Sequence, residues 1–517
     1  MSLFSQRAIS HQRPGNGAGG QMVRCLDLTL QFGLFYAALM AWVGVVVLST
    51  RMVAETDPLV PWAVGLIAAI ATISLNWTMR RPINAAWQGL LRILSVGDNA
   101  RWIVLSVGVG FVARLAWAVA FAADPVSDGL TYVQLAQKLL AGNEYAAAGT
   151  RAYWPPGYPF FLAPWLWAIE NQRLAIVASN LALFLLGAFG VFALGLRLVS
   201  VAGARLALVL FAIWPNLIFQ AGIPEKEQVL AALMPWILLL WCGTHAKPGP
   251  APGWRAVFAG VVFGCAMLVQ PAVQLLWVVL FICGWAAKRN LRQTVLALAC
   301  LMGGTALIVG PWTWRNMQVF NHFVLVSTNG GYGLFGANNP KATGGYLPNE
   351  YWPKDLVAMP ELDADREGKR RAFQWIADNP AQFALLGIEK NARFMGDDAQ
   401  GAYTTLNRNP SAKGGTVYAL FKGISNLFWL GFWWLVMASL LLRWRSRLRL
   451  DPSQLVVPAA FLYSFALHSV AESAGKYHVL WIGALCVLLP VLMPFNITQT
   501  PQAAKKLNNI NTSVQLP

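Results

Sequence analysis

Polar side chains that stand next to apolar stretches are the residues of this chain that could do chemistry. Asp128, in DPVSDGLTY (residues 124–132), directly follows an apolar stretch, and Tyr132 comes four residues later. A carboxylate there could accept a proton from an attacking hydroxyl, or it could bind sugar hydroxyls. The alternative is a helix N-cap, in which Ser127 or Asp128 accepts from the free N–H groups of a helix over residues 129–140.

Two more clusters combine acids, bases and aromatic side chains. Glu225 and Lys226, in IPEKEQ (residues 223–228), could hold a sugar and a phosphate, or could form a plain solvated turn. The sequence AESAGKYHVLW (residues 471–481) places the consecutive polar residues Lys476, Tyr477 and His478 before the last apolar stretch. His478 could take part in proton transfer, although an isolated histidine can equally be structural.

Two arginines are candidate phosphate ligands. Arg315, in PWTWRN (residues 311–316), could bind a phosphate through two parallel hydrogen bonds, or it could simply extend to the membrane interface. Arg114 stands in the middle of the apolar FVARLAWAV, where an ionisable group is costly. It could contact a lipid phosphate from inside the bundle, or it could pair with an acid for structural reasons.

Two loop motifs could shape a site. YWPPGYP (residues 153–159) predicts a rigid amphipathic turn, which could frame a substrate groove or anchor the chain at the interface. In VSTNGGYGLFGANNP (residues 326–340), glycine and asparagine permit turns that aim N–H groups at an anion, although a surface turn is the default interpretation. No GxxxxGK[ST] phosphate loop and no HExxH metal motif occurs, and no metal ligand is predicted.

The elements that must position these residues are transmembrane helices. Of 517 residues, 57% are hydrophobic and 12% are charged, about half the charged fraction of ordinary soluble domains. We therefore predict an all-α polytopic membrane protein with about 12 transmembrane helices and two long external loops. The predicted spans are 30–50, 59–77, 102–123, 174–196, 206–222, 228–243, 256–270, 272–287, 293–312, 416–442, 454–470 and 478–495. The pair that meets at Gln270-Pro271 could be a tight hairpin or one kinked re-entrant segment.

The net charge of +17 fits this topology. With the N-terminus in the cytoplasm, the cytoplasmic segments hold 20 of the 39 Lys and Arg residues. Both termini are then cytoplasmic. The basic residues on that side are predicted to face the lipid bilayer, and no nucleic acid partner is predicted. We divide the chain into a tail (1–29), two extra spans with a linker (30–100), a membrane core (101–312) with a first external loop (124–173), a second external loop (313–415) with helices over 364–377 and 380–395, C-terminal spans (416–495) and a tail (496–517).

The ordered motifs resemble a known family. The sequence carries Arg114 in a span, then SDGLTYVQLAQKLLAGNEY and YWPPGYPFFLAPW, then PWTWRNMQVFNHFVLVSTNGGYGLFGANNP and AFQWIADNP, and finally KYH. Over residues 101–495 this set is similar to bacterial GT-C glycosyltransferases of the dolichyl-phosphate-mannose protein mannosyltransferase and lipid A aminoarabinose transferase type.

The resemblance implies an inverting glycosyltransferase of the bacterial inner membrane with a periplasmic active site. It would move a sugar from a polyprenyl phosphate carrier to a glycan, lipid or protein acceptor. Asp128 matches the catalytic or orienting acid. Arg315 and Lys476 match donor-phosphate ligands better than Arg114 does, and Glu225 loosely matches a later acid. No cofactor is implied, and a divalent cation is left open.

The sequence departs from the family at two places. Many relatives have an Asp-Glu pair where this chain has Asp128-Gly129, and many have Arg-Tyr where it has Lys476-Tyr477. The rival functions are a secondary transporter or lipid flippase, and a non-catalytic partner in envelope polysaccharide assembly. A transporter predicts ionisable groups near mid-membrane on several spans, where only Arg114 and Lys422 stand.

Overall fold

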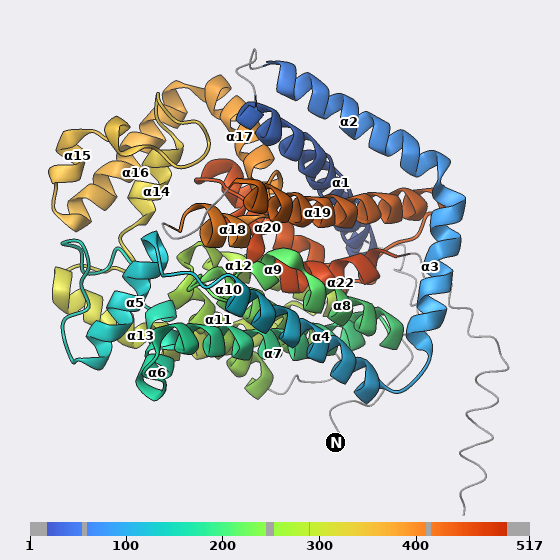
Figure 1. Ribbon diagram of the computed structural model, residues 1–517, viewed down its shortest axis with the longest axis horizontal. Coiled ribbons are helices and arrows are strands. Elements are labelled where there is room, and N and C mark those ends of the chain that lie inside the picture. The colour runs from blue at the N-terminus through green and yellow to red at the C-terminus, as the bar shows by residue number, and fades with distance from the viewer. Residues whose placement is uncertain (1–17, 54–58, 245–252, 289, 410–414, 494–517) are drawn as a thin grey trace, which may run out of the picture.

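The computed structural model describes residues 18–53, 59–244, 253–288, 290–409 and 415–493. Within these ranges the chain is built from helices, and the only β pairing is an isolated bridge between Ala147 and Thr150. Figure 1 shows long helices running roughly side by side, with shorter helices gathered at one end. The predicted tail 496–517 and the first 17 residues lie outside the described residues.

In the described ranges twelve apolar helices each overlap one of the twelve predicted spans, and seven of them are long enough to cross a membrane while five are shorter. The chain is therefore a multi-pass membrane protein. The long ones are α1 (Ala18–Val53), α2 (Leu59–Thr78), α4 (Asn99–Ala120), α7 (Gln172–Leu198), α10 (Glu227–Thr244), α13 (Leu291–Phe320) and α19 (Gly415–Arg445). The short ones are α8 (Val201–Ile213), α11 (Gly253–Val269), η2 with α12 (Pro271–Val273, Leu276–Lys288), α20 (Val456–Val470) and α22 (Ile482–Leu492).

Several boundaries differ from the predicted ones. Helix α1 begins at Ala18, so residues 18–29 are helical and do not form a tail. Helix α13 continues to Phe320, which puts Arg315 in a helix and not in a loop. The last predicted span is divided into the one-turn α21 (Lys476–Val479) and α22. At Gln270-Pro271 the chain turns, and α11 then packs mainly on α13 while α12 packs mainly on α20.

The predicted span 206–222 is broken, and Arg114 explains how the break is tolerated. Helix α8 ends at Ile213, and a short α9 (Pro215–Phe219) follows because Pro215 has no N–H to continue the hydrogen-bond ladder. The buried Arg114 guanidinium donates to the carbonyls of Ala212 (2.8 Å) and Phe211 (3.3 Å), and it lies 3.9 Å from the Phe184 ring centroid. Phe211 O is the acceptor that an N–H at position 215 would have used. Arg114 thus binds backbone carbonyls at this helix end, and it pairs with no acid in the described part of the chain.

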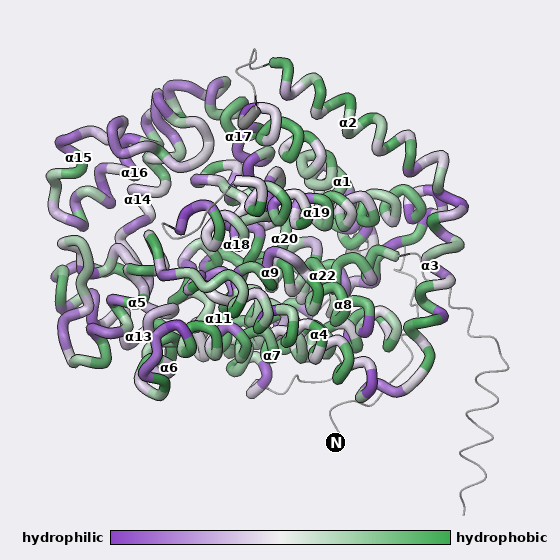
Figure 2. The backbone as a smooth tube through the Cα atoms, in the orientation of Figure 1, coloured by the Kyte–Doolittle hydropathy of each residue, from purple (hydrophilic) through white to green (hydrophobic). Residues whose placement is uncertain are grey.

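Short helices build the two long loops. The first loop contains α5 (Ser127–Leu140) and α6 (Gly157–Ala168). The second contains α14 (Gly330–Ala337), η3 (Asn349–Tyr351), α15 (Lys354–Ala358), α16 (Glu361–Asp378), α17 (Pro380–Met395), α18 (Gln400–Ala402) and η4 (Tyr403–Asn407). The predicted helices 364–377 and 380–395 are confirmed as α16 and α17. Figure 2 shows hydrophilic residues concentrated on α15 and α16, away from the apolar bundle.

Helix α17 is largely exposed in its first half and enters the bundle with its second half. Its end packs against α1 so closely that a Cβ on Gly44 would stand 2.3 Å from Ala392 O, and one on Gly396 would stand 2.6 Å from Gly44 C. Arg51 adds an ion pair to Glu389 at 2.6 Å. The first span therefore supports the segment that follows α17.

Helix α3 (Arg80–Ser95) lies at the end of the bundle opposite the two long loops, and Figure 1 shows it running across that end.

The glycine-rich motif at residues 330–336 forms the helix α14 and does not form a turn that could bind an anion. A Cβ on Gly331 would meet Asp365 O at 1.9 Å, and Gly331 N donates to Asp365 Oδ1 at 2.6 Å. These glycines let α14 pack on α16.

One carboxylate joins the two long loops. Glu361, in the first turn of α16, accepts from the N–H groups of Arg151 (2.6 Å) and Ala152 (2.9 Å) and from the Thr328 hydroxyl. Thr328 N also donates to Ala152 O at 3.1 Å. The YWPPGYP segment, which begins at Tyr153, is held in place by this contact.

We predict that Glu361→Ala loosens the first loop without unfolding the bundle. The variant leaves three donors without their acceptor, so hydrogen exchange of the residue 151 and 152 amides should accelerate by roughly tenfold. Hydrogen–deuterium exchange with mass spectrometry measures this. Glu350→Ala removes an exposed glutamate of the same loop and serves as the control. Equal exchange rates in both variants would contradict the role of Glu361 in joining the two loops.

Candidate active site

An acid and a base from distant parts of the sequence meet at the loop end of the bundle. Asp128 lies in the first turn of α5, and Lys476 begins α21. The Asp128 Oδ2 and Lys476 Nζ atoms are 3.8 Å apart, and their side chains are 45% and 27% exposed, so both reach solvent. Asp128 does not cap α5: the N-cap is Val126, and no side chain accepts from the first turn. The carboxylate is thus left for another partner.

The IPEKEQ loop closes on this pair. Gly129 has no room for a side chain, because a Cβ there would stand 2.8 Å from Pro224 O. The chain therefore leaves no room for a second acid directly after Asp128. Glu225 accepts from Thr404 Oγ1 at 3.1 Å, and Lys226 Nζ lies 5.9 Å from the Tyr132 ring centroid.

Burial and neighbouring charges shift the protonation of this cluster. Burial, followed by the Glu227 carboxylate, raises the pKa of Glu225 to about 8. Tyr477, with the carboxylates of Asp128 and Glu227, raises the pKa of Lys476 well above its usual value. Burial lowers the pKa of Lys226. At neutral pH the cluster therefore holds a charged Lys476 and a mostly protonated Glu225.

Aromatic rings line the inner side of the cluster. Tyr132 is 2% exposed and packs edge-on against Trp154 and Tyr158, with centroids 5.6 and 5.4 Å away. The hydroxyl of the fully buried Tyr158 has no hydrogen-bond partner among the described residues. YWPPGYP is thus part of the wall behind Asp128 and is more than an interfacial anchor.

The Lys476-Tyr477-His478 motif divides between three environments. Lys476 faces Asp128, while the Tyr477 hydroxyl donates to Glu472 at 3.2 Å and its ring stacks on His468 at 4.4 Å. His478 is fully buried, stacks on Trp429 at 4.1 Å, and places Nε2 3.0 Å from Asp398 Oδ1. His478, predicted to contact substrate, instead belongs to the core, because its ring follows Lys476 by half a helical turn and points inward.

Arg315 positions the first loop. Its guanidinium donates to Arg151 O at 2.8 Å and Tyr145 O at 3.1 Å, and it stacks over Trp312 at 4.7 Å. These contacts engage both terminal nitrogens of the guanidinium and hold residues 145–151. The role of Arg315 as a phosphate ligand stays a prediction.

Sequence reasoning missed a buried carboxylate that organises the site. Asp398, which is fully buried, accepts from Trp214 Nε1 (2.8 Å) and Asn216 Nδ2 (2.5 Å) in addition to facing His478. Asn426 and Ser425 of α19 bond its main chain. The only sequence signal for Asp398 was the acid pair in MGDDAQ (residues 395–400), directly after a predicted helix. Glu227 and Glu472 were also missed, although Glu227 stands within the quoted IPEKEQ.

The site therefore unites Asp128, Tyr132, Glu225, Lys226 and Lys476, with Tyr477 at its edge. It does not include Arg114, Arg315 or His478. Across the described ranges no group of three or more His, Cys, Asp or Glu side chains is arranged to hold a metal ion. That the protein uses no cofactor stays a prediction, with a divalent cation left open.

Of the comparisons with known proteins, the one with solved structures finds a match. No protein-family model matches the chain, and no curated protein matches it. A solved structure that is similar is the crystal structure of ArnT from Cupriavidus metallidurans bound to undecaprenyl phosphate, at 16% sequence identity. The alignment covers 76% of this chain and 78% of that chain, with a TM-score of 0.39. At that score no residue role is transferred, and the function is argued from this chain's own residues.

We predict that Glu225→Gln stabilises the protein at pH 8 but not at pH 5. The folded state keeps the Glu225 proton up to about pH 8, whereas an unfolded glutamate loses it above about pH 4.3, so wild-type stability falls as pH rises through this window. Gln has no proton to lose and keeps the oxygen that accepts from Thr404. Thermal unfolding should show a gain of roughly 1–3 °C at pH 8. Glu350→Gln, an exposed control, should not shift with pH; a pH-independent effect of Glu225→Gln would refute the assignment.

Proposed function

We propose that this protein is a membrane glycosyltransferase that moves a sugar from a polyprenyl phosphate carrier to an acceptor hydroxyl or amine. The observation that carries the proposal is the Asp128–Lys476 pair at 3.8 Å, open to solvent and backed by a wall of aromatic rings. A lipid-borne donor reaches such a site from the bilayer, and its phosphate needs a cation there. The donor class comes from the resemblance of the ordered motifs.

The pair provides the two charges that an inverting transfer needs. The acceptor atom, a hydroxyl oxygen or an amine nitrogen, forms a bond to the anomeric carbon while the bond from that carbon to the phosphate oxygen breaks. The proton of the acceptor passes to the Asp128 carboxylate, and the electron pair leaves with the phosphate. A phosphate beside Lys476 would draw its ammonium away from Asp128, which frees the carboxylate to act as base or acceptor orienter.

Glu225 contributes as a neutral group in this proposal. A fully ionised carboxylate beside the leaving phosphate would oppose the developing negative charge. With a pKa of about 8, Glu225 is mostly protonated at neutral pH and can donate a hydrogen bond to a sugar hydroxyl. Lys226 and Tyr132 complete the side that faces the sugar.

The distribution of basic residues supports a periplasmic active site in a bacterial inner membrane, with both termini in the cytoplasm. The acceptor would then be a glycan, lipid or protein of the envelope. A carrier-linked donor suits this compartment, because it needs no nucleotide at the site.

We expect Asp128→Asn to lower kcat by about 10²- to 10⁴-fold, because the amide cannot take up the proton. The assay follows release of polyprenyl phosphate from a lipid-linked sugar by purified protein supplied with envelope extract. Asp124→Asn is the matched control: Asp124 stands four residues earlier and pairs with Arg173 at 2.7 Å, outside the cluster. Full turnover by Asp128→Asn would remove Asp128 from this role. Substrate flux across vesicles without a covalent product would instead favour a transporter.

We expect Lys476→Gln to lower kcat by about 10²-fold because the leaving phosphate loses its counter-charge, whereas Lys476→Arg should keep most of the activity. Steady-state kinetics on the same donor tests both variants. Lys341→Gln, an exposed lysine of the second loop, is the control. Equal losses in the Gln and Arg variants would argue against a charge role.

A further inference from the structure

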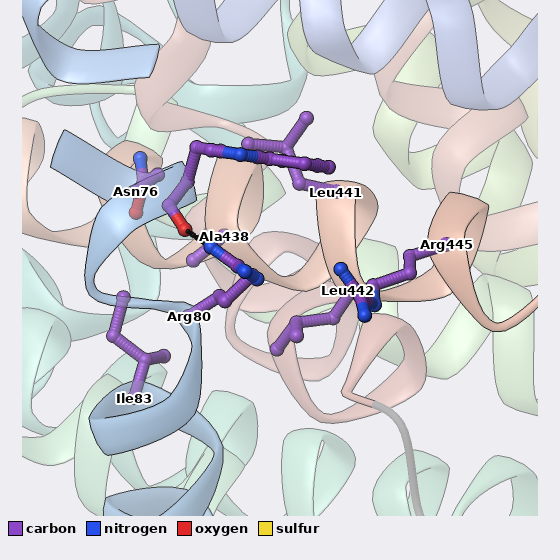
Figure 3. Close-up of a pocket in the computed structure, with 8 residues that line it drawn as sticks. Asn76, Arg80, Ile83, Ala438, Leu441, Leu442 and Arg445 are labelled. Carbon is purple, nitrogen blue, oxygen red and sulfur yellow. Dashed lines mark hydrogen bonds between the residues drawn. The ribbon is translucent and has the colours of Figure 1, made fainter. Parts of the chain in front are cut away.

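A hollow lies at the end of the bundle away from Asp128. It opens between the α2–α3 corner and the last turns of α19 (Figure 3). Its lining consists of Asn76, Trp77, Arg80 and Ile83 on one side and Ala438, Leu441, Leu442 and Arg445 on the other. No carboxylate lines it.

Asn76 is a buried polar group that the fold leaves unsatisfied. Its side chain is 2% exposed, yet neither its amide nitrogen nor its oxygen finds a hydrogen-bond partner in the described part of the chain. A buried amide without a partner is unfavourable, and such groups mark a missing ligand or water. A polar group that entered the hollow, which Asn76 lines, would give this amide a partner.

Two arginines determine the charge of that group. Arg80 bonds Trp77 O and lies 4.9 Å from the Trp77 ring centroid, which fixes its guanidinium at the rim while leaving other N–H groups available. Arg445 ends α19 across the hollow. Neither arginine occurs in an ion pair within the described ranges. Two cations and an amide donor around one space fit a phosphate.

The surroundings show that the phosphate must carry apolar chains. Leu66, Ile67 and Ile70 of α2 are each more than half exposed, so an apolar surface runs from the hollow along the helix. Helix α3 turns its apolar residues, among them Trp87 and Leu94, toward the bundle and crosses the helix ends (Figure 1). An inorganic phosphate would use only the rim, whereas a lipid would use both the rim and this surface.

We propose that Asn76, Arg80 and Arg445 bind the phosphate of an anionic phospholipid in the leaflet opposite the Asp128 site, with its acyl chains along α2. This site is separate from the transfer chemistry and does not depend on it. It gives the second span and α3 a function: they hold a structural lipid against α19.

Native mass spectrometry of the full-length protein titrated with phosphatidylglycerol tests the proposal. Arg80→Gln with Arg445→Gln should weaken binding about tenfold or more, as expected when charge-assisted hydrogen bonds are lost. Arg92→Gln, an exposed arginine of α3 outside the hollow, should bind as the wild type does. Unchanged binding by the double variant would overturn the site, as would equal binding of phosphatidylcholine or displacement of the lipid by excess inorganic phosphate.

Asn76→Leu separates binding from folding. If the amide serves a ligand, the variant loses phosphatidylglycerol binding while the delipidated protein unfolds at the wild-type temperature or above it. A lower unfolding temperature without lipid would show that Asn76 has a structural partner and would contradict the proposal.

Discussion

The site depends on the buried Asp398. Its side chain accepts from Trp214, which stands between α8 and α9, and from Asn216 in α9, and it faces His478 in α21. The loop that carries Glu225 follows α9, and Lys476 stands two residues before His478. Burial raises the pKa of Asp398, and an ionised carboxylate in that position is stable only because hydrogen-bond donors surround it. One carboxylate thus sets the separation between the two halves of the site.

The charge balance of the site is narrow. Four acids (Asp128, Glu225, Glu227 and Glu472) surround two lysines, although the proposed donor is itself anionic. The raised pKa of Glu225 removes one negative charge at neutral pH, and Lys476 stays ionised. An incoming phosphate then meets a cation whose existing partner is a single exposed carboxylate. Competition between that carboxylate and the phosphate couples binding of the donor to activation of the base.

Hydropathy and basic residues were enough to predict the helices, because a lipid-facing segment must be apolar along its whole length. They could not predict the break at Pro215, since both sides of it are equally apolar. They also could not separate Lys476 from His478: these residues stand two positions apart on a short helix and face opposite environments, and only the packing around Trp429 decides which one points inward. The roles of Arg114 and Arg315 were hidden for another reason. Each binds backbone carbonyls, and a carbonyl that needs a donor leaves no trace in a sequence.

The close contact of α1 with the end of α17 has a consequence for biogenesis. Gly44 and Gly396 touch through their backbones, and Arg51 pairs with Glu389, 338 residues further along the chain. The helix that enters the membrane first therefore completes its packing only after three-quarters of the protein has been synthesised. Until then the face of α1 that carries Gly44 lacks its partner in α17. Assembly of the site is consequently a late event, and a truncated chain would insert without becoming competent.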